Sequence, residues 1–216
     1  VPGDQAVGLS LNDFLRTHHE PRLTGTKLSC GQGGCGACTV HVARSQGDAV
    51  DTRSVNSCLF PLVLAHGKSI TTVEGLSQDK KQLHPVQERV VQFHGTQCGF
   101  CTPGMVMQLY WTLSRANGGK DATQAQLENA DALAGNLCRC TGYRPLQDAL
   151  KSFASDSTVT DHVGGRPVAP YNTEADPRVD PAALAGLGTR EELPGVATPT
   201  SLADLKSAWK NGESVV

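Results

Sequence analysis

The pattern of apolar and polar positions divides most of the chain into two ordered parts that meet near residue 77. In the first part, short β-branched runs such as Thr39–Val42 and Ser69–Val73 are separated by turns rich in Gly and Thr, which predicts strands. One helical pattern, Leu11–Arg16, precedes them, with Ser10 as its N-cap. We therefore expect a small α+β domain over residues 1–76.

Residues 77–155 have the apolar periodicity of helices instead. Four helices are expected, beginning at Pro85, Pro103, Thr123 and Pro145. Thr123 and Gln126 form a capping box for the third helix, which we expect to end at Gly135. Four short helices joined by brief loops predict a compact bundle.

The remaining residues predict a linker and then a further domain. Residues 156–195 are rich in Asp, Pro, Gly and Ala and lack periodicity, which is typical of an extended or disordered linker. From Val196 an amphipathic pattern returns, with a helix expected after Pro199–Ser201 and a strand over residues 213–216, so we expect residues 196–216 to be the truncated start of a third domain. Because the chain begins at Val1 and ends within an apolar run, we expect a fragment of a longer polypeptide.

Composition and charge limit the partners and the cellular compartment that we expect. The 216 residues carry a formal net charge of −2, and Lys and Arg are scattered, so we expect no nucleic-acid partner. No apolar run approaches membrane-spanning length, so no membrane partner is expected either. The cysteines cluster locally and include a C-x-C pair that is too close to bridge without strain. We therefore expect a reducing compartment, the cytoplasm or alternatively the peroxisome.

The eight cysteines form two sets of four, and none is left over. The first set is Cys30, Cys35, Cys38 and Cys58. Its C-x4-C-x2-C spacing with a distant fourth Cys is typical of a plant-type 2Fe–2S ferredoxin. The loop is dense in glycine, which lets the backbone wrap closely around a cluster and aim N–H groups at sulfur. A zinc site with four cysteines, or free or disulfide-bonded cysteines, are the alternatives.

The second set is Cys98, Cys101, Cys138 and Cys140. Both of its pairs precede predicted helices, where the helix dipole and free N–H groups favour thiolate. Taken alone, C-x2-C with C-x-C leaves zinc as a serious rival. Beside the first set, a second iron–sulfur centre is favoured, and two one-electron centres in series predict an electron relay. A stand-alone ferredoxin-like carrier and a zinc interaction module remain as other hypotheses.

Four stretches carry a family resemblance: Gly25–Val40, Leu83–Arg89, Gln97–Gly104 and Gly135–Pro145. Together they resemble the iron–sulfur region of the molybdenum hydroxylases, the family that includes xanthine dehydrogenase and aldehyde oxidase. The resemblance runs from about residue 11 to residue 153. It implies a plant-ferredoxin-like (β-grasp) 2Fe–2S domain followed by a four-helix-bundle 2Fe–2S domain. The stretch Pro199–Leu205 looks like the opening of the family's FAD domain.

The resemblance also implies the partners of the two clusters. In the family, the cluster of the bundle lies next to molybdopterin on a separate domain, and the ferredoxin-like cluster faces FAD. Gln97 and Cys140 match positions that approach the pterin. Gly33, Gly34 and Gly36 match the loop near the flavin.

The implied reaction is hydroxylation at molybdenum of a carbon beside nitrogen in a purine, or of an aldehyde carbon. Electrons would leave singly through the second cysteine set, then the first, to FAD and on to NAD⁺ or O₂. No residue of this segment is expected to be catalytic. Leu83–Arg89 and Gln97–Gly104 look closest to xanthine dehydrogenase, so we expect hypoxanthine and xanthine as substrates. An aldehyde oxidase or another N-heterocycle hydroxylase is the alternative, and a homodimer of the whole assembly is expected.

Overall fold

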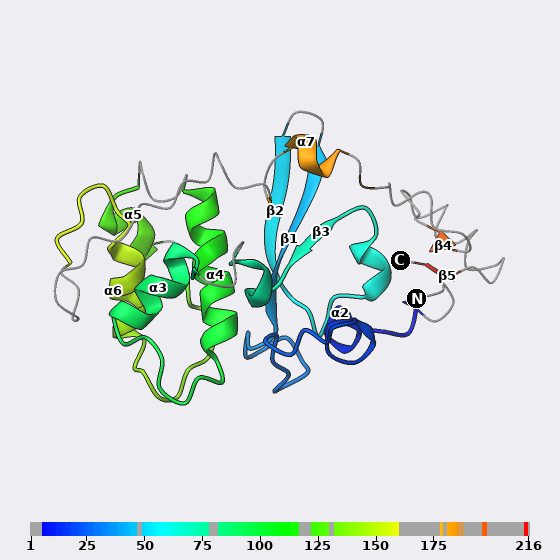
Figure 1. The fold of residues 1–216 in the computed structure, drawn as a ribbon, viewed down its shortest axis with the longest axis horizontal. Helices are drawn as coiled ribbons and strands as arrows, with labels where there is room; N and C mark the ends of the chain where they lie inside the picture. Colours follow the sequence, from blue (N-terminus) through cyan, green and yellow to red (C-terminus); the bar gives the residue numbers. More distant parts are fainter. Residues whose placement is uncertain are drawn as a thin grey trace.

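A computed structural model describes residues 6–46, 49–77, 82–116, 122–129 and 132–159, together with 178, 181–185, 187, 196–197 and 214–215. A small sheet with short helices and a group of longer helices lie next to each other (Figure 1). This mixture confirms the predicted α+β composition. Most of the predicted linker, and the helix expected after residue 199, lie outside the described residues.

The sheet is antiparallel and has the strand order β2-β1-β3. Its strands are β1 (Thr39–Gln46), β2 (Ala49–Asn56) and β3 (Ser69–Thr71). The central strand β1 is buried from Thr39 to Ala43 because both of its faces are covered. Val40 and Val42 pack on Leu11 and Leu15, whereas His41 points to the other face, toward the helical part.

Two short helices, α2 (Leu11–Asp13) and η1 (Phe14–His18), cover one face of the sheet. Ser10 caps α2 as predicted, because its hydroxyl accepts a hydrogen bond from the Asp13 N–H. The expected single helix continues as a π-helix, in which His19 N–H donates to Phe14 O at 2.9 Å. The Thr17 hydroxyl donates to Asp13 O at 2.6 Å and so takes the carbonyl that an α-helical N–H would use.

Two 3₁₀ turns complete the first part. They are η2 (Leu62–Ala65), which lies within the apolar run after Cys58, and η3 (Val73–Gly75). The predicted strand through Val73 therefore ends earlier, at Thr71.

The second part contains α3 (Pro85–Gln92), α4 (Thr102–Arg115), α5 (Gln124–Asn129) and α6 (Arg144–Lys151). Their predicted starts are confirmed to within one residue. The capping box before α5 is also confirmed, since Thr123 N–H donates to Gln126 Oε1 at 2.8 Å. The predicted end of the third helix at Gly135 is wrong. Residues 132–135 form a turn because the chain must leave the helix to reach the first part.

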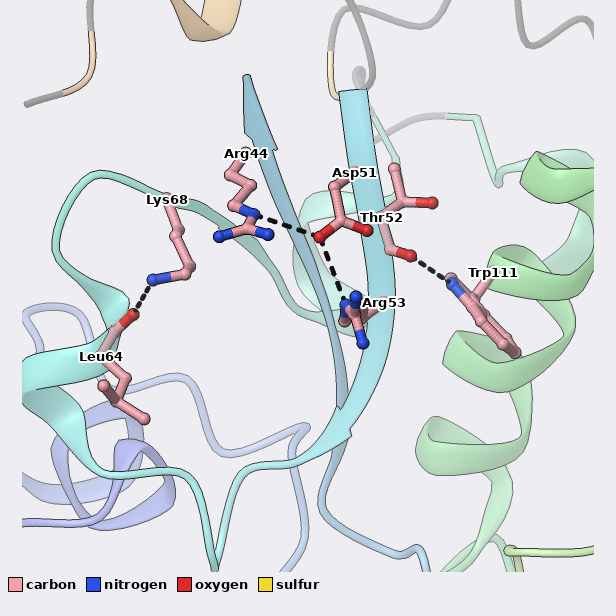
Figure 2. A network of polar contacts seen from close by, with 7 residues as sticks. All are labelled: Arg44, Asp51, Thr52, Arg53, Leu64, Lys68 and Trp111. Carbon is pink, nitrogen blue, oxygen red and sulfur yellow. Dashed lines mark hydrogen bonds and ion pairs between the residues drawn. The ribbon is translucent and has the colours of Figure 1, made fainter. Parts of the chain in front are cut away.

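Helix α4 joins the two parts. Its Tyr110 is fully buried and meets the rings of His41 and His84 edge-on, at centroid distances of 5.0 and 5.5 Å. Trp111 donates its Nε1–H to the Thr52 carbonyl of β2 at 3.1 Å, next to the Asp51 carboxylate that pairs with two arginines (Figure 2). Aromatic rings with a polar group are well suited to such a contact. The two parts are therefore packed against each other along this helix.

Three further short elements are described: α7 (Pro181–Leu184), β4 (Val196–Ala197) and β5 (Ser214–Val215). Helix α7 packs on β1, and Leu184 is buried there. Strands β4 and β5 pair in parallel, which places β5 within the predicted strand at residues 213–216. Within the described residues, no helix combines the length and the apolarity that crossing a membrane requires.

Candidate metal centres

The first cysteine set is assembled by one loop and one turn. The loop of residues 30–38 reverses direction at Gly31, Gly33 and Gly36, whose φ values are +66°, +72° and +68°. Glycine adopts these values without steric cost. The loop brings the Cys30 thiol against that of Cys35, while the Cys38 thiol meets that of Cys58 in the turn after β2. All four are free thiols.

Side chains at the end of β2 hold this loop in place. Asn56 donates its Nδ2–H to the Gly33 carbonyl at 2.8 Å, and Ser57 donates its hydroxyl to the Cys38 carbonyl at 2.7 Å. Leu59 lies over Gly33, where a Cβ atom would come within 2.4 Å of Leu59 Cδ1. The loop conformation is thus fixed by the protein, as a site prepared for a ligand requires.

The second set is assembled by two helix starts, as the sequence predicts. Cys98 and Cys101 come directly before α4, and Cys138 and Cys140 come before α6. The Cys101 thiol interacts with that of Cys138, and the Cys140 thiol interacts with that of Cys98. The N–H of Thr141, just before α6, donates to Cys138 Sγ over 3.4 Å and favours the thiolate form of that residue.

The pKa values show which thiols ionise readily. Hydrogen bonding by the Gln32 N–H lowers the pKa of Cys30 from 9.0 to about 7. Burial raises the pKa of Cys38 to about 11 and that of Cys101 to about 12. For Cys138, burial acts to raise the pKa, but hydrogen bonds from Thr141 outweigh it and the value falls to about 7.

Each set therefore combines a thiol that ionises near neutral pH with a buried or partly buried thiol that resists ionisation. The interaction with the Cys98 thiol also raises the pKa of Cys140. Thiols of raised pKa release their protons to solvent when a strongly positive centre such as a metal ion binds the sulfur. The donor sets thus fit metal-bound thiolates.

Within each set, the thiols interact in pairs. Within the described residues, no three His, Cys, Asp or Glu side chains surround a common point as a single metal ion would require. A zinc site needs four donors about 2.3 Å from one ion. A 2Fe–2S cluster instead spreads its thiolates over two irons. The thiol pairs fit this second geometry: Cys30 with Cys35, Cys38 with Cys58, Cys98 with Cys140, and Cys101 with Cys138.

The two cysteine loops contact each other directly. Leu137 donates its N–H to the Cys35 carbonyl at 2.9 Å, and Leu137 is bonded to Cys138. Beside it, the buried Asn136 donates its Nδ2–H to the Gly36 carbonyl at 2.9 Å and toward Thr39 Oγ1 at 3.1 Å. Cys138 of the second set is therefore connected to Cys35 of the first through its peptide bond to Leu137 and the hydrogen bond that Leu137 donates.

This contact depends on Gly36, which the sequence analysis singled out, and on Gly104 and Asn136, which it did not. A Cβ atom on Gly36 would lie 2.4 Å from the Gly135 carbonyl oxygen, and one on Gly104 would lie 2.3 Å from the Gly36 carbonyl oxygen. The one signal in the sequence was the position of Gly104 and Asn136 inside motif stretches. A glycine in a first helical turn indicates a close approach of another segment.

The predicted cofactor residues fall into two groups. Gln97 and Cys140 are exposed and lie at one end of the second set, since Gln97 adjoins Cys98 and Cys98 meets Cys140. In the first loop, Gly34 is exposed, whereas Gly36 is buried against the second part. Their roles toward a pterin and a flavin stay predictions.

Comparisons with known proteins agree with this division. Residues 5–63 match the family model of the 2Fe-2S iron-sulfur cluster binding domain. Residues 72–151 match that of the [2Fe-2S] binding domain. The chain is 53% identical over 148 residues to a xanthine dehydrogenase of Blastobotrys adeninivorans, a match that covers 67% of this chain and 10% of that protein. It is 54% identical over 138 residues to aldehyde oxidase 1 of Oryctolagus cuniculus, covering 63% and 10%.

Solved structures show the same relationship. Quinoline 2-oxidoreductase from Pseudomonas putida 86 matches with a TM-score of 0.55 and 39% identity, over 67% of this chain and 80% of that one. The aldehyde oxidoreductase from Desulfovibrio gigas matches with a TM-score of 0.55 and 37% identity, over 67% and 15%. The chain spans about a tenth of the length of the curated relatives it matches.

Proposed function

Because the chain belongs to the molybdenum hydroxylase family and forms its 2Fe–2S region, we propose that it relays electrons between a molybdenum site and a flavin within a longer enzyme. The observation that carries the proposal is the contact between the loops of the two cysteine sets, in which Leu137 N–H donates to Cys35 O. A relay needs two redox centres held at a fixed, short separation, and this contact provides it.

The cysteines have the following roles in the proposal. Cys30, Cys35, Cys38 and Cys58 hold one 2Fe–2S cluster, and Cys98, Cys101, Cys138 and Cys140 hold the other. When bound, each cluster accepts and releases one electron at a time. The protein's own contribution is the spacing of the clusters and the hydrogen bonds to their thiolates.

The domain organisation follows the two cysteine sets. We infer a plant-ferredoxin-like β-grasp domain over residues 1–76 and a four-helix bundle over residues 77–155, supported by the sheet order β2-β1-β3 and by α3 to α6. A linker over 156–195 and the start of an FAD domain over 196–216 complete the proposal.

The partners of the relay lie in other parts of the enzyme. Gln97 and Cys140 are assigned to the pterin side and Gly33 and Gly34 to the flavin side, whereas Gly36 of the same loop packs against the second part. FAD and the molybdenum cofactor are therefore the proposed neighbours, with NAD⁺ or O₂ as the final acceptor and a homodimer as the assembly. Locally clustered cysteines support a reducing compartment, the cytoplasm or the peroxisome.

For the substrate, we propose a purine such as hypoxanthine or xanthine. The 53% identity to a xanthine dehydrogenase supports this choice. The 54% identity to an aldehyde oxidase supports an aldehyde as the second candidate. Turnover of hypoxanthine against an aldehyde by the full-length enzyme, with NAD⁺ and with O₂, separates the two.

The relay is tested by Cys101→Ser in the full-length enzyme. The variant should stop substrate-driven reduction of the flavin, because the second centre loses a thiolate ligand. Reduction of an artificial acceptor by NADH should persist, since that reaction enters at the flavin. Two distinct 2Fe–2S signals in the EPR spectrum of the reduced wild-type enzyme should fall to one.

Leu137→Ala is the matched control, because it changes a neighbouring exposed side chain and keeps every cysteine. Equal loss of both activities in Cys101→Ser would contradict the proposed order of the relay. Two iron atoms per chain instead of four in the wild-type enzyme would remove one cluster from the proposal.

A further inference from the structure

Two hydrogen bonds from one residue converge on the sulfur of Cys138. Thr141 donates its N–H to Cys138 Sγ over 3.4 Å, and its Oγ1 lies 3.1 Å from the same sulfur. The two residues are three positions apart, in the turn that leads into α6. Donors at this range stabilise negative charge on a thiolate.

A third residue leaves the proton of the Thr141 hydroxyl available for Cys138. Tyr143 donates its N–H to Thr141 Oγ1 at 3.2 Å. A hydroxyl group has one proton and two lone pairs, so an oxygen that accepts from Tyr143 keeps its proton free to donate elsewhere. A metal-bound thiolate can only accept, so the Thr141 hydroxyl donates to Cys138.

Tyr143 also closes the network from the other side. Its hydroxyl oxygen accepts the Cys138 N–H at 2.7 Å. The residue holds a left-handed backbone with φ of +69°, which is costly for a bulky side chain and persists where the surroundings over-determine it. Cys138, Thr141 and Tyr143 thus form a closed ring of hydrogen bonds whose geometry is set by the protein.

We propose that Thr141 is a positioning residue that raises the reduction potential of the second centre by donating its hydroxyl to Cys138. Reduction adds negative charge to a cluster and its thiolates, so donors to sulfur favour the reduced state. A higher potential suits the centre that receives electrons from the molybdenum side. The inference rests on the proposed function, since it requires a 2Fe–2S cluster at these cysteines.

The experiment is an EPR-monitored redox titration of the full-length enzyme and its Thr141→Val and Thr141→Ser variants. Valine keeps the shape and the N–H but lacks the hydroxyl, whereas serine keeps the hydroxyl. At a fixed ambient potential, Thr141→Val should lower the ratio of reduced to oxidised second centre about fivefold, as expected for one hydrogen bond. Thr141→Ser should restore the ratio, and the first centre should titrate as in the wild type in both variants.

Thr123→Val is the control, since it removes a hydroxyl that caps α5 and should leave both potentials unchanged. An unchanged ratio for a fully loaded second centre in Thr141→Val would overturn the proposal. Thr141→Val and Thr141→Ala could instead lose the second cluster while Thr141→Ser keeps it. That result would also overturn the proposal, because the hydroxyl would then be needed to assemble the cluster and not to set its potential. Iron analysis of the wild type separates these outcomes from failure of the proposed function, which predicts four irons.

Discussion

Asn136 is the side chain that most directly joins the two cysteine loops. It is buried, and its Nδ2 group reaches both the Gly36 carbonyl and the Thr39 hydroxyl. The role of Asn136 could not be predicted from the sequence, because a polar side chain beside a cysteine motif does not reveal a partner one hundred positions away. The cysteines themselves were found because their spacing follows the local wrapping of the chain around a ligand.

Replacement of this side chain should measure the strength of the contact. Asn136→Ala should lower the free energy of unfolding by about 1 kcal/mol, because the buried Gly36 carbonyl loses one donor and keeps those of Thr39. Urea denaturation followed by circular dichroism is the measurement. Gln124→Ala is the control, since Gln124 donates its side chain to Asp156 at an exposed position and should change stability by less than about 0.5 kcal/mol. Equal losses in the two variants would contradict a special role for Asn136.

At the scale of secondary-structure elements, α4 is an example of a feature that could be predicted from the sequence. Its start was predictable because proline suits a first helical turn, and the same signal located α3 and α6. The edge strand β2 was missed because its polar residues alternate with few apolar ones. The end of α5 was misplaced because Gly135 was interpreted as the helix C-terminus, whereas residues 132–135 form a turn. Local chemistry was therefore predictable, whereas tertiary contacts were not.

Gly104 tests how closely α4 approaches the first cysteine loop. Gly104→Ala would place a Cβ atom 2.3 Å from the Gly36 carbonyl oxygen, so the helix or the loop must shift. We expect a loss of about 1–3 kcal/mol in the free energy of unfolding, the usual cost of overpacking. Gly8→Ala is the control, because a Cβ atom there meets nothing within 4 Å. Thermal denaturation of both variants measures the effect, and a Gly104→Ala protein as stable as Gly8→Ala would refute the close approach.

At the scale of the whole molecule, the fold holds the two cysteine sets in a fixed position relative to each other. The position is maintained by the packing of α4 on β1 and β2, to which Tyr110 and Trp111 contribute. The guanidinium of Arg178 lies 5.3 Å from the Tyr110 ring centroid. Arg178 also donates to the Gly75 and Leu76 carbonyls, so it binds the segment that connects the two parts. An electron relay depends on such rigidity, because the separation of the centres decides how readily electrons pass between them.

The hydrogen bond between the loops should therefore affect the passage of electrons more than it affects stability. Leu137→Pro removes the N–H that donates to Cys35 O and should cost about 1 kcal/mol of stability. In the full-length enzyme, substrate should still reduce the second centre at the wild-type rate. Reduction of the first centre should then lag behind, as followed by freeze-quench EPR. Leu137→Ala keeps the N–H and should show no lag, so a lag in both variants, or in neither, would contradict a role for this hydrogen bond in electron passage.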